Sequence, residues 1–404
     1  MTAQQTLIPG LILMLAGLTA LGPLSTDAYL PAIPAIAQDL GVSIHDVELS
    51  VSLFLAGFSL GQLTGGPFSD RYGRRPAIFL GLSLFFVGSM AATLAQSIET
   101  LWIARMLQGF GGGMSVVNSA AVIRDRYAGR ESAQAMSRMA SILMAAPLLA
   151  PVLGTLLLEV ADWRSIFIFL AAYALLILLV LALCLPETHD PRPGPRPNPL
   201  RSYLDVLTHR SALGYLISIA LSYAGMFAFI TGSAGSYIHY YGASPALYTG
   251  LFALNIVTLL ACNQINIRLL HRYSSRQLLQ FGQRIQLLCG TLMLAAFLLF
   301  EAPLWLIVGL IMLYIGVQGF VIANGMAGTC EFFPHTAATA TALLGACGFA
   351  SGALAGALVG LLGDGTPLPM MLIMFTASLA GNLIGLWLLP RRADASTTRS
   401  VTES

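Results

Sequence analysis

The sequence predicts an all-α membrane protein of twelve transmembrane helices, arranged as two six-helix bundles related by pseudo-symmetry. Three observations predict this fold class. The 404 residues are 56% hydrophobic and only 9% charged, which is outside the usual composition of soluble proteins. Twelve apolar stretches are each long enough, at about 20 residues, to cross the hydrocarbon core as a helix. One long polar stretch, residues 187–210, divides these stretches six and six.

The first apolar stretch has no basic leader and no small-residue cleavage site, so we expect a retained helix and not a removed signal peptide. The proline-rich opening of 187–210 is expected to be an extended, cytoplasmic linker. We therefore predict an N-terminal bundle at 1–186, a C-terminal bundle at 211–390 and a cytoplasmic tail at 391–404. The expected spans are 7–35, 46–68, 76–95, 100–122, 137–160, 164–185, 211–232, 245–268, 277–299, 303–326, 337–361 and 368–389.

The charged residues predict the orientation in the membrane. All twenty basic residues are arginine, and eighteen of them fall on one side of the predicted spans, for example Arg71, Arg74 and Arg75 between the second and third. The positive-inside rule then places both termini in the cytoplasm, and we expect a bacterial inner membrane protein. The loops on the other side carry mostly acids, which are Asp39, Asp46, Glu48, Glu99, Glu159, Asp162, Glu301 and Asp364.

The sequence argues against an enzyme. Its five cysteines lie within or at the ends of predicted spans and show no CxxC or Cys/His spacing, so neither a metal site nor a disulfide framework is expected. No long extramembrane domain, glycine-rich phosphate loop or nucleophile elbow is present. We expect a monomer in the lipid bilayer, with no cofactor and no nucleic-acid partner.

The loop after the second span carries a compact charged motif, GPFSDRYGRR at 66–75, in a turn that its two glycines permit. Arg71-Tyr72-Gly73-Arg74-Arg75 has an echo at 272–276, RYSSR, after the eighth span. The echo falls at the same loop of each half. Two six-helix halves related in this way are typical of transporters that bind substrate between the halves near the midplane.

Several motifs resemble those of one family. The residues Gly66, Asp70, Arg71, Gly73 and Arg74 resemble the signature GxLaDrxGrk of the major facilitator superfamily. LWIARMLQG at 101–109 is similar to its second motif, an intramembrane Arg followed by Gln-Gly. Together, PLSTDAYLPAIP at 23–34, the fifth-span pattern of Pro147, Pro151 and Gly154, and FALNIV at 252–257 resemble the bicyclomycin-resistance (Bcr/CflA) group of drug and proton antiporters.

The resemblance implies roles for these residues. Asp70, Arg71 and Arg74, with Asp125 after the fourth span, would form a cytoplasmic charge cluster that stabilises the outward-facing state. Pro147, Pro151 and Gly154 would bend or loosen the fifth span. The acid of the first span and the arginine of the fourth would belong to the proton and substrate pathway.

The residues themselves single out Asp27 and Arg105. Asp27 is the one acid that we place firmly inside a span, where an aspartate costs about 2.5 to 3.5 kcal/mol and should face the interior or a water-filled cavity. Pro31 also removes the amide that would bond the carbonyl of residue 27. Burial favours the neutral form of a carboxyl and a nearby cation the charged form, so Asp27 could exchange a proton, with Arg105 as the cation. The alternatives are an Asp27 that only fixes packing and an Arg105 that only joins two helices.

Glycines recur at four-residue spacing in two rows, Gly57 to Gly65 and Gly348 to Gly360, and such rows allow helices to pack closely. This packing could be static, or it could lie at an interface between the halves that moves during transport. A substrate pocket should be mostly apolar with a few polar anchors, although a buried aromatic residue can equally serve packing alone. The candidate pocket residues, besides Asp27, are Asn118, Tyr223, Phe227, Phe252, Asn255 and Asn324.

These observations favour a multidrug exporter. It would use the proton gradient to move amphipathic antibiotics or metabolites, of the bicyclomycin, chloramphenicol and sulfonamide range, out of the cytoplasm by alternating access. A nutrient, nucleoside or amino-acid importer or uniporter on the same scaffold stays open, because a fold does not fix the direction of transport. A membrane receptor or channel is a second alternative, disfavoured by the paired halves.

Overall fold

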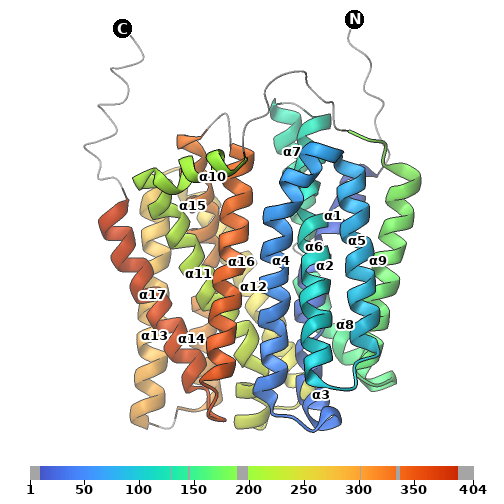
Figure 1. Ribbon diagram of the computed structural model, residues 1–404. Coiled ribbons are helices and arrows are strands. Elements are labelled where there is room, and N and C mark those ends of the chain that lie inside the picture. Colours follow the sequence, from blue (N-terminus) through green and yellow to red (C-terminus); the bar gives the residue numbers. More distant parts are fainter. Residues whose placement is uncertain are drawn as a thin grey trace, which may run out of the picture.

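The chain is helical throughout the residues that its computed structural model describes, which are 10–127, 129–143, 146–188, 199–300, 302–333 and 337–389. The helices stand in two groups side by side, α1 to α9 in the first group and α10 to α17 in the second group (Figure 1). Ten helical segments in these ranges are long and apolar enough to cross a membrane. The predicted all-α membrane architecture is confirmed.

The first group begins with a broken helix. The described part of the predicted span 7–35 belongs to four short helices. Pro31 and Pro34 cannot donate amide hydrogen bonds to the carbonyls of residues 27 and 30, which accounts for the breaks after α2 and after η1. The described residues of the predicted span 137–160 belong to α7 and α8, and residues 144–145 lie outside the described ranges. The helices of this group are α1 (Leu11–Thr19), α2 (Leu21–Asp27), η1 (Leu30–Ala32), α3 (Ile33–Leu40), α4 (Ile44–Tyr72), α5 (Arg74–Thr93), α6 (Ile98–Arg126), α7 (Gly129–Leu143), α8 (Ala146–Val160) and α9 (Arg164–Cys184).

The second group begins with a helix that the sequence analysis did not predict, α10, inside the expected linker; the proline-rich residues 189–198 lie outside the described ranges. Its helix α11 continues into a π-helix, η2. The helices are α10 (Pro199–Thr208), α11 (Arg210–Ala234), η2 (Gly235–Tyr240), α12 (Pro245–Leu269), α13 (Ser275–Phe300), α14 (Leu304–Gly316), α15 (Gln318–Phe332), α16 (Ala337–Leu361) and α17 (Leu368–Leu388).

The two remaining expected spans correspond to α6 and to α7 with α8. Helix α6 has 29 residues but is rich in glycine and polar residues, and α7 and α8 have 15 residues each. These two expected spans, 100–122 and 137–160, are therefore not among the ten long apolar segments. Together with those ten, they account for the twelve expected crossings.

Charge divides the two ends of the bundle. The end of the bundle at which α4, α6 and α12 finish is called the basic end. It carries Arg71, Arg74, Arg124, Arg126, Arg268 and Arg272. The opposite end is called the acidic end, and it carries Asp39, Asp46, Glu99, Asp162 and Asp364. Helix α1 begins and α17 ends at the basic end (Figure 1). Five further arginines of the linker and tail, at 192, 196, 391, 392 and 399, lie outside the described residues.

The two glycine rows have different neighbours. In α4, a Cβ atom on Gly57 or Gly61 would collide with the backbone of α6, so this row packs two helices of the first group backbone to backbone. In α16, a Cβ atom on Gly352 would meet the ring of Phe227 in α11. One on Gly356 would lie 2.5 Å from the Ser52 hydroxyl in α4. Helix α16 therefore packs on both α4 and α11, at the seam between the groups.

Candidate functional site

Asp27 is the last residue of α2, directly before the helix break. It is buried, at 5% exposure, and the Thr26 hydroxyl donates a hydrogen bond to its Oδ1 atom at 2.9 Å. The break itself follows from Pro31, which leaves the carbonyl of residue 27 without the helical amide that it would otherwise accept from. Asp27 thus lies inside the membrane-spanning part at a point where the backbone is not a regular helix.

Asp27 lines a cavity of about 470 Å³ between the two groups. Its walls are mostly apolar, and it extends from Asp27 toward Arg124 and Thr341, near the basic end. This combination of an apolar wall with a few polar groups is typical of sites for small molecules. Its lining includes Thr19, Pro23, Asp27, Phe58, Pro147, Tyr223, Phe227, Phe252, Asn255 and Phe349.

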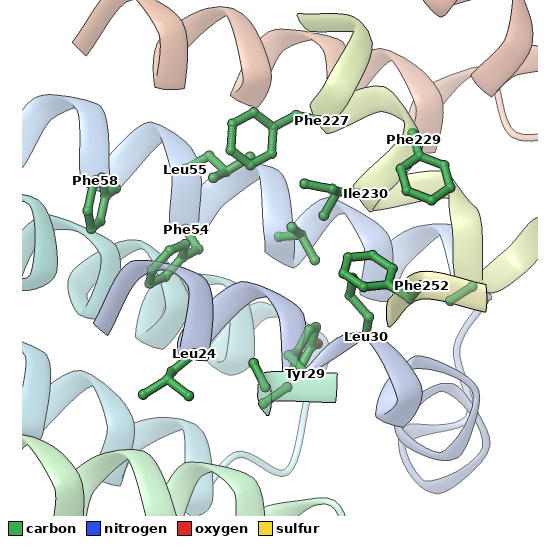
Figure 2. Close-up of a cluster of buried hydrophobic side chains, with 14 of the residues drawn as sticks. Leu24, Tyr29, Leu30, Phe54, Leu55, Phe58, Phe227, Phe229, Ile230 and Phe252 are labelled. Atoms are coloured by element: carbon green, nitrogen blue, oxygen red, sulfur yellow. The ribbon is translucent and has the colours of Figure 1, made fainter. Parts of the chain in front are cut away.

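Aromatic rings from three helices meet in the cavity wall. The Phe349 ring of α16 lies 4.6 Å from that of Phe58 in α4, and 5.9 and 5.6 Å from those of Tyr223 and Phe227 in α11, between ring centroids. Figure 2 shows Phe58 and Phe227 on facing helices of the two groups. Tyr223, Phe227 and Phe252 were expected to line a pocket, and the structure places them there. Phe58 and Phe349 were not predicted.

Two amide side chains supply unpaired polar atoms to this wall. Asn255 donates its Nδ2 hydrogen to the Leu251 carbonyl, while its Oδ1 atom is buried and has no hydrogen-bond partner among the described residues. Gln62 of α4 likewise has a buried, unpartnered Oε1 atom. Leaving a buried acceptor unsatisfied costs about 1 to 3 kcal/mol, so both atoms would gain from a donor on a bound molecule or water.

Asn118 and Asn324 were expected in the pocket but are not among its lining residues. The Asn118 amide donates to the Met114 carbonyl within α6. The Asn324 amide donates to Asn266 Oδ1 at 2.8 Å and thereby joins α15 to α12. In this conformation both are buried inside their own group of helices.

Arg105 is fully buried but does not pair with Asp27. Its guanidinium donates to Gln108 Oε1 at 2.6 Å and to the Ser25 carbonyl at 3.1 Å. The charge lies over the rings of Tyr29 and Phe54, at 4.6 and 4.4 Å from their centroids. Aromatic faces attract a desolvated cation by about 2 kcal/mol or more. Arg105 therefore joins α6 to α2 two residues before Asp27, outside the cavity lining.

The charged motif after α4 forms a compact cluster centred on Arg74. The Arg74 side chain pairs with Asp70 and, at 2.8 Å, with Asp125 of α6. Gly73 has a φ of 106°, a conformation that other residues rarely adopt. Arg71 takes no part in these ion pairs and lies over the Tyr72 ring. A Cβ atom on Gly66 would have no neighbouring atom within 4 Å.

Glu187 completes the cluster, although the sequence analysis had assigned it to the linker. Its carboxylate accepts the backbone amides of Arg74 and Arg75 at 2.9 and 3.1 Å, and it occupies the space beside Gly73 where a Cβ atom would be. An anion in this position satisfies free amides at the start of α5. The linker is thereby fixed to the α4–α5 turn.

Replacing Glu187 with alanine is expected to destabilise this turn. Two hydrogen bonds to a charged acceptor would be lost, at about 1.5 to 3 kcal/mol each before relaxation. Thermal unfolding in detergent should show a lower midpoint, and amide exchange at Arg74 and Arg75 should accelerate. Glu131→Ala, at an exposed site in α7, serves as the control. Unchanged exchange at both amides would contradict this role of Glu187.

The proline and glycine residues of α8 lie against the break next to Asp27. A Cβ atom on Gly154 would collide with the carbonyl oxygen of Ala28, so only glycine permits this approach. Pro151 is buried inside α8, and Pro147 lines the cavity. The neighbouring Thr155 hydroxyl lies 2.7 Å from that of Thr249 in α12, across the two groups.

One acid was misplaced by the sequence analysis. The sequence places Glu48 with the acids of the loops on that side, at the start of the expected span 46–68, and Asp27 as the one acid firmly inside a span. In the structure Glu48 belongs to α4, which begins at Ile44, and it is 1% exposed. Helix α4 begins two residues before the expected span 46–68, at a capping box formed by Ser43 and Asp46, so Glu48 lies in its second turn and not at its end.

Comparisons with known proteins agree with this architecture and with the motifs. The sequence profile of the Major Facilitator Superfamily matches residues 15–355. A bicyclomycin resistance protein homolog of Haemophilus influenzae is 32% identical over 366 residues, covering 90% of this chain and 92% of that protein. A chloramphenicol resistance protein of Pseudomonas aeruginosa is 29% identical over 390 residues, covering 93% and 89%.

The fold is also found among solved structures. The crystal structure of a D-xylose-proton symporter superposes with a TM-score of 0.73 at 18% identity, covering 94% of this chain and 97% of the symporter. At this identity the likeness concerns the fold alone. The resemblance predicted from the motifs is confirmed by the family profile and by the drug-resistance relatives. This chain belongs to the major facilitator superfamily of membrane transporters.

Proposed function

We propose that this transporter exports amphipathic small molecules from a bacterial cytoplasm in exchange for protons. The observation that carries the proposal is the position of Asp27, a buried carboxyl in the wall of a large apolar cavity between the two groups. Among the described residues no arginine pairs with this carboxyl. A carboxyl in such surroundings binds or releases a proton as water and charge reach it.

The conformation supports a direction for the cycle. The cavity extends toward the basic end, which faces the cytoplasm in this proposal, in agreement with the positive-inside rule. At the acidic end, contacts such as that between Thr155 and Thr249 join the groups. A substrate would enter from the cytoplasm and favour loss of the Asp27 proton to that side. Opening of the acidic end would let an outside proton re-load Asp27 and weaken the hold on the substrate.

The cavity fits molecules that combine rings with hydrogen-bond donors. The rings of Phe58, Tyr223 and Phe349 offer stacking surfaces, while Asn255 and Gln62 offer buried acceptors. Chloramphenicol, with a nitrophenyl ring, hydroxyls and an amide, has this chemistry, and a relative of this chain is named for resistance to it. It is therefore the first substrate to test, with bicyclomycin second.

The test uses everted vesicles with an acid lumen, from cells without their own drug pumps. Adding chloramphenicol or bicyclomycin should release lumenal protons and drive the compound into the lumen. A resistance panel in the same strain should show growth at raised drug concentrations. Uptake that is saturable but indifferent to the pH gradient would contradict proton exchange and favour a uniporter.

Replacing Phe349 with alanine is expected to weaken chloramphenicol binding. Phe349 contacts rings from both groups, and an aromatic pair contributes about 0.5 to 1.5 kcal/mol. The dissociation constant should rise about 2- to 12-fold, measured by binding of the radiolabelled drug to purified protein. Phe300→Ala, at an exposed site in α13, should leave binding unchanged. Equal affinities of the two variants would exclude Phe349 from the site.

A further inference from the structure

The acidic end contains a pair of a buried acid and a partly exposed histidine that the mechanism above does not use. Glu48 is 1% exposed, and its Oε2 atom lies 3.1 Å from Nδ1 of His45, one helical turn earlier in α4. Taking a carboxylate out of water is costly unless a partner compensates its charge. At this separation the two side chains can share one proton, as an ion pair or as a neutral pair.

The pair lies between the two groups of helices. Glu48 Oε1 is 2.7 Å from the place of a Cβ atom on Gly235, the first residue of the π-helix η2. The His45 ring fills the space beside Gly363, after α16, where a Cβ atom would collide with it. His45 and Glu48 belong to the first group, and both glycines belong to the second. Separating the groups at this end would therefore expose the pair.

Water has a route to the pair. His45 and Glu48 line a cavity of about 330 Å³, together with Ser43, Ser236, His239 and Thr366. The other titratable groups near the pair are Asp46 on α4, His239 on η2, Tyr248 on α12 and Asp364 after α16.

Of these neighbours, Asp364 lies in the loop between α16 and α17. Partial burial opposes ionisation of Asp364, but hydrogen bonds from the Thr366 side chain and backbone lower the pKa of its carboxyl below the usual value. Asp364 therefore stays charged near neutral pH. It does not supply the proton that the pair exchanges.

We propose that His45 and Glu48 form a proton-sensitive latch, which takes up one proton when the acidic end closes and releases it when that end opens. The inference rests on the proposed alternating access and adds a second proton-binding position to it. In the open form both side chains meet water, where histidine titrates near about 6.5 and glutamate near about 4.3. Above pH about 6.5 the open pair holds no proton, whereas the closed pair, in which the glutamate is buried against Gly235, holds one.

The sign of the pH effect follows from this difference. Because the closed form binds one more proton than the open form above pH about 6.5, raising the pH favours the open form. One proton of difference changes the ratio of open to closed molecules by up to about tenfold per pH unit. An acid exterior then holds the acidic end closed, which is the direction required for inward proton movement.

The experiment measures opening of the acidic end by spin-label distances. Labels are placed at Leu94→Cys after α5 and Leu362→Cys after α16, which are exposed sites in different groups. The five native cysteines are replaced, and every protein carries Asp27→Asn, so that the cavity carboxyl cannot contribute. Double electron–electron resonance is recorded in lipid nanodiscs between pH about 3.5 and 8.5, a range that includes the reference pKa values of glutamate and histidine.

In the parent protein, the fraction of molecules with the longer distance between the two labels should increase as the pH rises above about 6.5. With Glu48→Gln the closed form holds no extra proton, so the distances should stay constant. His45→Gln leaves a buried glutamate that still takes up a proton, and its response should begin nearer pH about 4.3. Glu99→Gln, an exposed acid at the same end, should behave like the parent.

A Glu48→Gln protein that responds to pH like its parent would overturn the latch, as would a parent without any response. Either result leaves the proton exchange assigned to Asp27 intact, since that is measured separately by substrate-driven proton release. Conversely, absence of substrate-driven release would contradict the proposed function without changing the spin-label result.

Discussion

Replacing Asp27 with asparagine will uncouple transport from the proton gradient while the protein still folds. Asparagine has nearly the same volume and keeps a hydrogen bond with Thr26 possible, but it cannot carry a proton at physiological pH. If one proton exchanges per substrate, each pH unit supports about a tenfold concentration ratio of substrate. In the variant this ratio should fall to one, as measured by chloramphenicol accumulation in everted vesicles at an imposed pH gradient.

The control for this experiment is Asp162→Asn, an exposed acid at the acidic end, which should accumulate substrate like the parent. Both proteins should elute as single peaks in size-exclusion chromatography and bind chloramphenicol. Drug counterflow, which needs no proton turnover, should persist in Asp27→Asn. An Asp27→Asn protein that still concentrates substrate and still releases lumenal protons would remove Asp27 from the coupling step.

A second large effect is expected for Gly154→Val. The first carbon of any side chain at this position collides with the Ala28 carbonyl oxygen, which is backbone and cannot rotate away. Helix α8 would have to move from the break that positions Asp27. Overpacking of this kind costs about 1 to 3 kcal/mol. If that cost falls on the conformational step, chloramphenicol counterflow should slow about 5- to 150-fold.

Gly309→Val provides the matched control, because Gly309 of α14 is exposed and no neighbouring atom lies within 4 Å of the place of a Cβ atom there. It carries the same change in helix propensity without the collision. Initial rates of counterflow should therefore fall in Gly154→Val only. Equal rates for the two variants would show that α8 does not need its close approach to Ala28 during transport.

The sequence allowed much of this arrangement to be predicted. Hydropathy and the arginine distribution predicted the helices and the two ends of the bundle. The acid and the prolines of the first span predicted a break at Asp27, and α2 does end there. Each of these signals is local: it depends on composition, on the missing amide of proline, or on the cost of a charge in lipid.

The features that were missed depend on contacts between distant segments. Phe349 is one apolar residue in an apolar helix, and the sequence cannot say that it faces Phe58 and not lipid. Glu187 was assigned to the linker because its partners, the amides of α5, precede it by more than one hundred residues. Arg105 was predicted to be a buried charge paired with the Asp27 carboxylate. In the structure its guanidinium instead contacts aromatic rings and donates a hydrogen bond to the Ser25 carbonyl.

Glu48 illustrates the same limit at a helix end. The capping box of Ser43 and Asp46 is a pattern that can be read from neighbouring residues, and it places Glu48 in the second turn of the helix and not at its end. Its burial, however, depends on Gly235, which lies in another group of helices.

The glycine rows of α4 and α16 pack against different kinds of atoms, and this difference determines which of these glycines can be substituted. Main chain contacts main chain along α4 and α6, so a methyl group added at Gly57 or Gly61 has no space unless these two helices separate. Along α16, Gly348, Gly352 and Gly356 meet rings and hydroxyls, which are side-chain atoms that can rotate, whereas Gly360 lies nearest the His45 carbonyl of α4. Substitutions at Gly348, Gly352 and Gly356 can therefore be accommodated only if neighbouring side chains shift, whereas Gly57 and Gly61 of α4 are confined to the smallest residue.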